Sequence, residues 1–244
     1  MCEEKIYQPL EDTASTQLLN ELLLRKFLAS YGTILTAQEP LPLLGLKLLS
    51  VIVERNAAFV LILKKLGLVQ ILFEYFQVGH SKFNAATLKI IRAIVASREI
   101  ELEELLRMNV IEKINAIMAE FVTTNPEWCS DHLLVIMHEI LHLAAELKKK
   151  KSNSTVPQQV FDDLLVNFSA FCKLLSESDV SIVEGASYTM LAFIHFSMIQ
   201  GIQTNPLLMI QDQQLSTILP AFKLEKQIVA KNLLKSLFWA LSLG

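Results

Sequence analysis

The chain has 244 residues, of which 52% are hydrophobic, and its mean hydropathy is +0.40. The formal net charge is −3 and the isoelectric point is about 6.0, so the chain lacks the basic excess that neutralises a phosphate backbone, which argues against nucleic acid as a main partner. A membrane-spanning helix needs roughly 18–20 apolar residues, and the longest apolar runs are interrupted or shorter, at 41–53, Ala57–Leu63 and Leu133–Met137. We therefore expect a soluble chain that does not span a membrane.

Apolar residues recur at helical spacing from one end of the chain to the other. Gly67, Gly79 and Asn109 stand where helices are expected to stop on a left-handed residue, and Pro126 stands where one is expected to start. No segment shows the apolar–polar alternation of a strand bounded by turns, so we expect no sheet. In chain order the predicted helices cover 18–28, 41–55, 57–65, 68–78, 84–97, 99–108, 110–123, 127–150, 158–176, 180–200, 206–222 and 224–242.

An internal repeat is the most informative feature of the sequence. Leu46–Val53 and Leu88–Val95 align at an offset of 42 residues, with six of eight positions apolar in both copies. The corner that follows repeats at the same offset, because Leu66–Gln70 aligns with Met108–Glu112. Further copies fit with small insertions, at Leu134–Leu141 and, more weakly, at Tyr188–His195.

A period of this length is typical of armadillo and HEAT repeats. The sequence therefore predicts an all-α fold, an armadillo/HEAT-like right-handed superhelical solenoid of about five repeats. We predict a single domain over 1–244, with a flexible N-terminus at 1–14 and an inter-repeat loop at 151–157. Because stacked repeats bury their helices on several sides, this fold accounts for the hydrophobic composition without a membrane.

The segment His138-Glu139-Ile-Leu-His142 has the H-E-x-x-H pattern, in which two histidines on one helical face bind zinc and the glutamate activates water. The sequence offers no motif for a third ligand, since Ala145 and Lys148 occupy the places of the longer pattern. Glu146, Asp162 and Asp163 remain as conceivable ligands.

The repeat alignment explains the same histidines differently, because they fall at positions that are mostly polar in the other copies. On a solenoid these positions form one ridge, along which a partner helix or peptide would lie in the concave groove. We therefore predict no catalytic or cofactor-binding residue and no cofactor, with His138 and His142 as metal ligands only under the zinc hypothesis. The predicted protein-interaction residues are Ser50, Glu54, Arg92, His138 and His142.

Three further residue types bear on the environment and the core. Cys2, Cys129 and Cys172 are odd in number and far apart, which favours free thiols in a reducing, cytoplasmic compartment over a disulfide framework. His195 stands alone in an apolar segment, and we expect it in the core. Trp239 is expected to be a packing anchor, or an interface residue if it is exposed.

The stretch Leu41–Asn56, continuing through Phe59 to Leu66–Val69, resembles the C-terminal armadillo-like region of Fused-type kinases, a family that includes an Unc-51-like pseudokinase. The resemblance covers 40–110 and weakens after Pro126. It implies the regulatory tail of such a kinase, acting as a scaffold in cilium, centrosome, microtubule or Hedgehog-type signalling assemblies. The chain itself carries no Gly-rich loop, Lys-bearing strand or H-R-D segment, and no functional residue transfers from the family.

We therefore predict a non-catalytic protein–protein interaction scaffold in the cytoplasm, at the cilium, the centrosome or microtubules. The alternatives are a zinc-dependent hydrolase and a tubulin-binding helical-repeat domain. The tubulin alternative needs basic loop tips, for which Lys64, Lys65 and Arg107 are the candidates. A homodimer through an exposed apolar end is a further alternative, since a repeat array without capping repeats leaves such an end uncovered.

Overall fold

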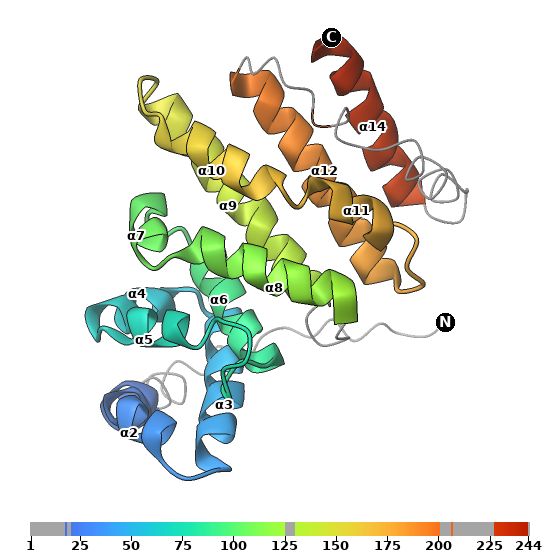
Figure 1. Cartoon of the computed structure of the whole chain (residues 1–244). Helices are drawn as coiled ribbons and strands as arrows, with labels where there is room; N and C mark the ends of the chain where they lie inside the picture. The colour runs from blue at the N-terminus through green and yellow to red at the C-terminus, as the bar shows by residue number, and fades with distance from the viewer. Residues whose placement is uncertain (1–17, 19–20, 125–129, 201–205, 207–226, 244) are drawn as a thin grey trace, which may run out of the picture. The chain divides into compact units, whose positions relative to one another are not determined.

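All regular structure in the described part of the chain is helical, and no strand occurs there, as the fold class predicted. The chain divides into two compact units, Met1–Leu46 and Lys47–Gly244. The segment predicted to be flexible, 1–14, lies outside the described residues, as do most of the predicted helix at 206–222 and the thiols of Cys2 and Cys129. The computed structural model describes residues 18, 21–124, 130–200, 206 and 227–243 (Figure 1).

The first unit is built around a buried tyrosine. The ring of Tyr31 meets that of Phe27 edge-on, with 5.3 Å between centroids, and neither Tyr31 nor Leu35 is accessible to solvent. Gly45 lets the start of α3 approach this cluster, because a Cβ there would lie only 2.6 Å from Cγ2 of Ile34. The helical elements of this unit are a π-helix at Leu23–Phe27, a 3₁₀ turn at Leu28–Ser30, α2 at Tyr31–Thr36 and the first part of α3.

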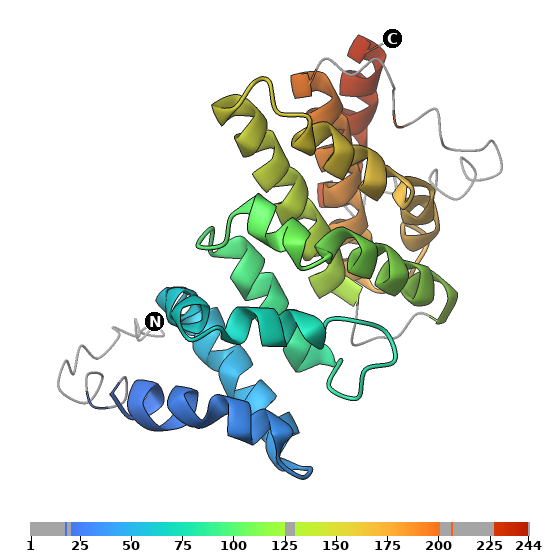
Figure 2. The same ribbon diagram turned by 60° about the vertical axis from the view of Figure 1, so that its left-hand side comes forward.

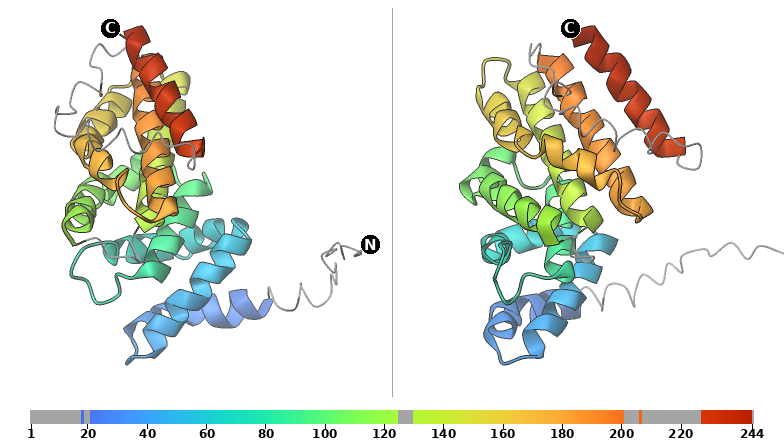
Figure 3. Two further views of the ribbon diagram at one scale, coloured as in Figure 1. Left: turned by 90° about the vertical axis from the view of Figure 1, so that its right-hand side faces the viewer. Right: turned by 45° about the vertical axis from the view of Figure 1, so that its right-hand side comes forward.

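The second unit repeats a group of three helices. The first helices of successive groups, α6, α9 and α12, pack on one another, and α14 packs on α12. These four helices form a ladder, while the other helices form a second layer beside it (Figures 2 and 3). The helices are α3 (Leu41–Arg55), α4 (Ala58–Lys65), α5 (Leu68–Glu74), α6 (Ala85–Ala96), α7 (Leu102–Arg107), α8 (Val110–Thr124), α9 (Ser130–Lys150), α10 (Val156–Leu165), α11 (Phe168–Leu174), α12 (Val180–Gln200) and α14 (Gln227–Leu243).

One predicted helix is wrong. The segment 158–176 forms two helices, α10 and α11, which are separated by Val166 and Asn167. The buried amide of Asn167 donates to Oδ1 of Asn115 at 2.6 Å and to the carbonyl of Leu164 at 3.2 Å, which holds the chain in a corner. This corner corresponds to the left-handed corners at Gly67 and Asn109, with φ of 69° and 55°. A break thus recurs at the corresponding corner of this repeat, although the helical periodicity across Val166 predicted none.

Lysine side chains link successive repeats. Lys113 of α8 donates its ammonium to the carbonyl of Phe73 in α5, and Lys173 of α11 donates to that of Val122 in α8 at 2.9 Å. Each acceptor lies near the C-terminal end of its helix, where carbonyl groups lack intrahelical partners and a cation is favoured. A lysine therefore bridges each of two successive repeat junctions.

A cluster of phenylalanines joins α10 and α11 to α12. The rings of Phe161 and Phe196 stack at 5.1 Å, and Phe193 lies within 6 Å of Phe161, Phe168 and Phe171. All five side chains are buried. Cys172 lies in the same layer, and burial raises the pKa of its thiol to about 11, so it is a structural and unreactive cysteine.

Among the described residues, one segment, Val180–Ile199 in α12, is long and apolar enough to cross a membrane. In the structure α12 lies between α9 and α14, and 56% of the apolar window is buried there (Figure 3). A helix that is apolar on all sides is expected in the middle of such a stack. The packing of α12 thus accounts for its composition without a bilayer.

We predict that Phe193→Ala lowers the free energy of unfolding by about 3–5 kcal/mol, because it opens a cavity among rings that cannot collapse onto one another. Val166→Ala, at an exposed position in the second layer, should change stability by less than about 0.5 kcal/mol. Urea unfolding followed by circular dichroism measures both. Equal stability of the two variants would contradict the role of the ring cluster.

Candidate functional site

The outer face of the ladder carries four of the five predicted interaction residues. Glu54 and His142 are exposed, and Arg92 and His138 are half-buried, so all four reach the surface at equivalent positions of α3, α6 and α9. Ser50 does not. Its side chain is buried, and its hydroxyl donates to the carbonyl of Lys47 at 2.8 Å.

A groove runs between the end of α3 and α6. Glu54 and Arg92 both line this hollow of about 340 Å³. Arg92 also reaches α9, where its Nη1 lies 3.1 Å from Nδ1 of His132 and 3.9 Å from Oδ2 of Asp131. Burial lowers the pKa of His132, and so does the charge of Arg92, which keeps the ring neutral and able to accept a hydrogen bond.

Arg98 connects the end of α6 to the middle of α9. It follows α6 with a φ of 63°, the left-handed conformation that commonly ends a helix. From there its guanidinium donates to Oε2 of Glu139 at 2.6 Å and lies 3.8 Å from Oε1 of Glu146. A hydrogen bond from His138, together with the charge of Arg98, holds the pKa of Glu139 below its ordinary value, although partial burial opposes this. Glu139 is thus a structural carboxylate in the ladder.

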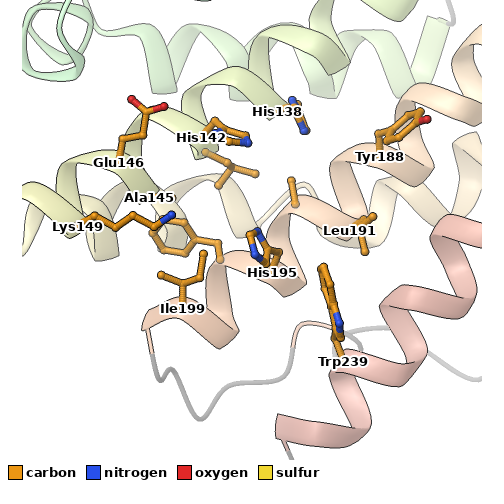
Figure 4. A pocket seen from close by; sticks show the side chains of 13 residues that line it. His138, His142, Ala145, Glu146, Lys149, Tyr188, Leu191, His195, Ile199 and Trp239 are labelled. Carbon is orange, nitrogen blue, oxygen red and sulfur yellow. The ribbon is translucent and has the colours of Figure 1, made fainter.

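A pocket of about 220 Å³ opens between α9, α12 and α14 (Figure 4). The ring of His195 lies against the indole of Trp239, with 5.0 Å between centroids and 31° between planes. The apolar walls come from Leu141, Leu191, Ile199 and neighbouring side chains, whereas the polar groups belong to His138, His142, His195, Glu146, Lys149 and Tyr188.

Of the residues that line this pocket, only His138 and His142 were predicted as site residues. His195 was expected in the core, but the structure exposes it. Partial burial of its ring nevertheless lowers the pKa of His195, and the nearby charges of His142 and Lys149 lower it further. Trp239 was expected to be a packing anchor or an interface residue, and it lines the pocket while packing on His195. The sequence separates these two residues by more than 40 positions, so only the packing of α14 on α12 brings them together.

The histidines do not assemble into a metal site in the described part of the chain. The rings of His138 and His142 are 5.5 Å apart at their centroids, and no group of three His, Cys, Asp or Glu residues there is placed to hold a metal ion. Of the conceivable third ligands, Glu146 pairs with Arg98, and Asp162 accepts a hydrogen bond from Gln158 at 2.9 Å. The arrangement suits binding by apolar, aromatic and charged contacts better than it suits hydrolysis.

The loop tips expected to contact tubulin are only partly available. Lys64 donates to Oε2 of Glu104 at 2.6 Å and to the carbonyl of Glu99 at 3.2 Å, so it links α4 to the next repeat. Lys65 and Arg107 remain exposed.

The comparisons with known proteins agree with a HEAT-like repeat region. A family model described as serine/threonine-protein kinase ULK4-like, HEAT repeats, matches residues 2–61, which overlaps the resemblance predicted over 40–110. The crystal structure of an engineered protein, a structural genomics target, is similar with a TM-score of 0.52 and 11% identity, over 91% of this chain and 97% of that one. No curated protein sequence matches the chain. The chain is therefore a helical-repeat protein, and its residues 2–61 are similar to the HEAT repeats of ULK4-like kinases.

We predict that Glu139 makes the stability of the fold sensitive to acid. Its pKa is lower in the folded chain than in the unfolded chain, so its stabilising contribution is present above the ordinary value of 4.5 and is lost as the pH falls through the lowered folded value. The free energy of unfolding should therefore fall more between pH 7 and pH ~3 for the parent chain than for Glu139→Gln. Glu101→Gln, at an exposed position, should behave like the parent. An identical acid response of Glu139→Gln and the parent would contradict the prediction.

We also predict that the purified chain holds no stoichiometric zinc, because Glu139 is engaged by Arg98 and the two histidines lack a third ligand among the described residues. Elemental analysis of the parent and of His138→Ala should give the same metal content. About one equivalent of zinc that is lost in His138→Ala would instead support the hydrolase alternative and make Glu139 the residue to test.

Proposed function

We propose that the chain is a non-catalytic interaction scaffold that holds a partner helix or peptide along the outer face of the ladder. The observation that supports this most is the pocket between α9, α12 and α14, which lies on the same helices that continue the predicted ridge. Its apolar walls can take one large apolar side chain of a partner. Interfaces of this kind draw most of their binding energy from one such anchor in a desolvated pocket.

The polar groups at this pocket favour a particular kind of anchor. His142, His195 and Lys149 place two imidazoles and an ammonium around the apolar walls, with Glu146 as the one acidic group. A partner segment with an aromatic or aliphatic side chain next to a carboxylate would satisfy both parts of the pocket. Protonation of His195 would strengthen such a contact, and because burial lowers the pKa of His195 from its ordinary value of 6.5, binding should increase only as the pH falls below that value.

The wider setting is proposed from the family resemblance. The match of residues 2–61 to the HEAT repeats of ULK4-like kinases supports a role as the regulatory repeat region of a Fused-like kinase or pseudokinase. We propose that this region acts in the cytoplasm, in ciliary, centrosomal or microtubule-associated signalling, through protein partners and without a cofactor.

The pocket is tested by filling it. The experiment is proximity labelling with the whole chain in ciliated cells. Ala145→Trp fills the pocket, and His142→Glu places a negative charge at its edge. Each variant should reduce the yield of labelled partners about tenfold, which corresponds to a loss of about 1.4 kcal/mol in binding free energy. Val166→Asp, at an exposed position in the second layer, is the matched control and should leave the labelling unchanged. Thermal unfolding shows whether each variant keeps the fold.

Two outcomes would contradict the proposal. The same partners at the same yield with Ala145→Trp would remove the pocket from the interaction. The tubulin-binding alternative would be favoured if the chain co-sediments with microtubules and the double variant Lys65→Glu with Arg107→Glu abolishes this binding, whereas Ala145→Trp does not.

A further inference from the structure

The last helix of the ladder has one face packed on α12 and one face open to solvent. Val229, Leu233 and Ser236 are buried, and the buried amide of Asn232 donates to the hydroxyl of Ser187 on α12 at 3.1 Å. On the other side, Leu234, Leu237 and Leu241 are 59%, 44% and 83% exposed.

These three leucines form one stripe because they are spaced three and four residues apart. Phe238, also exposed, lies on the same side of the helix. An exposed stripe of this spacing has the pattern that amphipathic helices use to pack on one another. We call these four residues the α14 stripe.

Positive charge borders the α14 stripe. Lys231 and Lys235 are exposed on α14, and the helix contains no acidic residue between Gln227 and Leu243. Both lysines lie one turn before members of the stripe, on one edge of it. A surface that combines leucines with bordering lysines is complementary to a leucine stripe bordered by carboxylates.

We propose that the α14 stripe docks an amphipathic helix of another protein whose apolar stripe is flanked by Asp or Glu. A second copy of this chain is the poorer occupant, because antiparallel pairing of two α14 helices about their middle brings Lys235 of each copy close to the other. Neither helix offers a carboxylate in return, so like charges would face each other across the interface.

The α14 stripe is separate from the pocket at Trp239. Trp239 follows Leu237 by two residues, which turns its side chain about 200° around the helix. A helix on the stripe and a peptide in the pocket can therefore be tested independently, and this proposal does not rest on the proposed function.

The test uses two synthetic helical peptides of about 20 residues with the same leucine stripe, one flanked by Glu and one by Lys. Binding of each labelled peptide to the whole chain is followed by fluorescence anisotropy at low salt. The Glu peptide should bind about tenfold more tightly than the Lys peptide. Leu237→Asp should weaken Glu-peptide binding about tenfold or more, because it places a charge at the centre of the apolar contact.

Charge reversal provides a second variant that does not touch the apolar contact. Lys231→Glu with Lys235→Glu should invert the preference, so that the Lys peptide binds more tightly. The matched control Val166→Asp, which places the same charge on another exposed surface, should leave Glu-peptide binding unchanged. All of these chains also carry Ala145→Trp, because the filled pocket then cannot take a leucine of the peptide.

Three results would overturn the proposal. Equal affinity for the two peptides would show that the lysines do not select the partner. Glu-peptide binding that survives Leu237→Asp would place the contact elsewhere. A concentration-dependent dimer in sedimentation velocity that is lost in Leu237→Asp would assign the stripe to a second copy of the chain.

Discussion

The second unit depends on the burial of α12 between α9 and α14. Gly185 lets α12 approach α9 closely, since a Cβ there would lie 3.1 Å from Cδ1 of Leu134. The hydroxyl of Thr189 donates to the carbonyl of Leu134 at 3.2 Å across the same contact. On the opposite side, Asn232 of α14 reaches Ser187. Because α12 is apolar on nearly every side, the chain gains its largest helix–helix burial only when both neighbours are in place.

This packing also creates the surfaces with which the chain can bind. When α14 settles on α12, Trp239 comes against His195 and closes one side of the pocket that α9 and α12 begin. The same docking turns the α14 stripe outward, because a helix at the end of the array has a neighbour on one side only among the described helices. Stacking alone thus forms the two surfaces proposed for binding, which agrees with the proposed role as a scaffold.

The charged side chains of the ladder form contacts between successive repeats. Arg98 and Arg92 each reach from one repeat to the next, and their partners Glu139, His132 and Asp131 all belong to α9. The residues of the H-E-x-x-H pattern take part in these contacts. The glutamate is the partner of an arginine one repeat earlier, and the histidines reach solvent at positions that are mostly polar in the other copies.

The repeat was readable from the sequence because it rests on local rules. Helical spacing, corner residues such as Gly67 and Asn109, and a constant offset all follow from neighbours within one repeat. Helices 41–55 and 180–200 have the predicted bounds for this reason. The break at Asn167 was missed because its cause is a hydrogen bond to Asn115, which lies one repeat earlier.

By itself the sequence determined the helical class, the repeat and the approximate ridge of polar positions, since these depend on periodicity. Only the tertiary structure decided which side chains of that ridge reach solvent. Ser50 turned inward to the carbonyl of Lys47, and His195 turned outward onto Trp239. The physical reason is that the exposure of a ladder residue is set by the helix that packs beside it, and that neighbour lies 40 or more residues away in the chain.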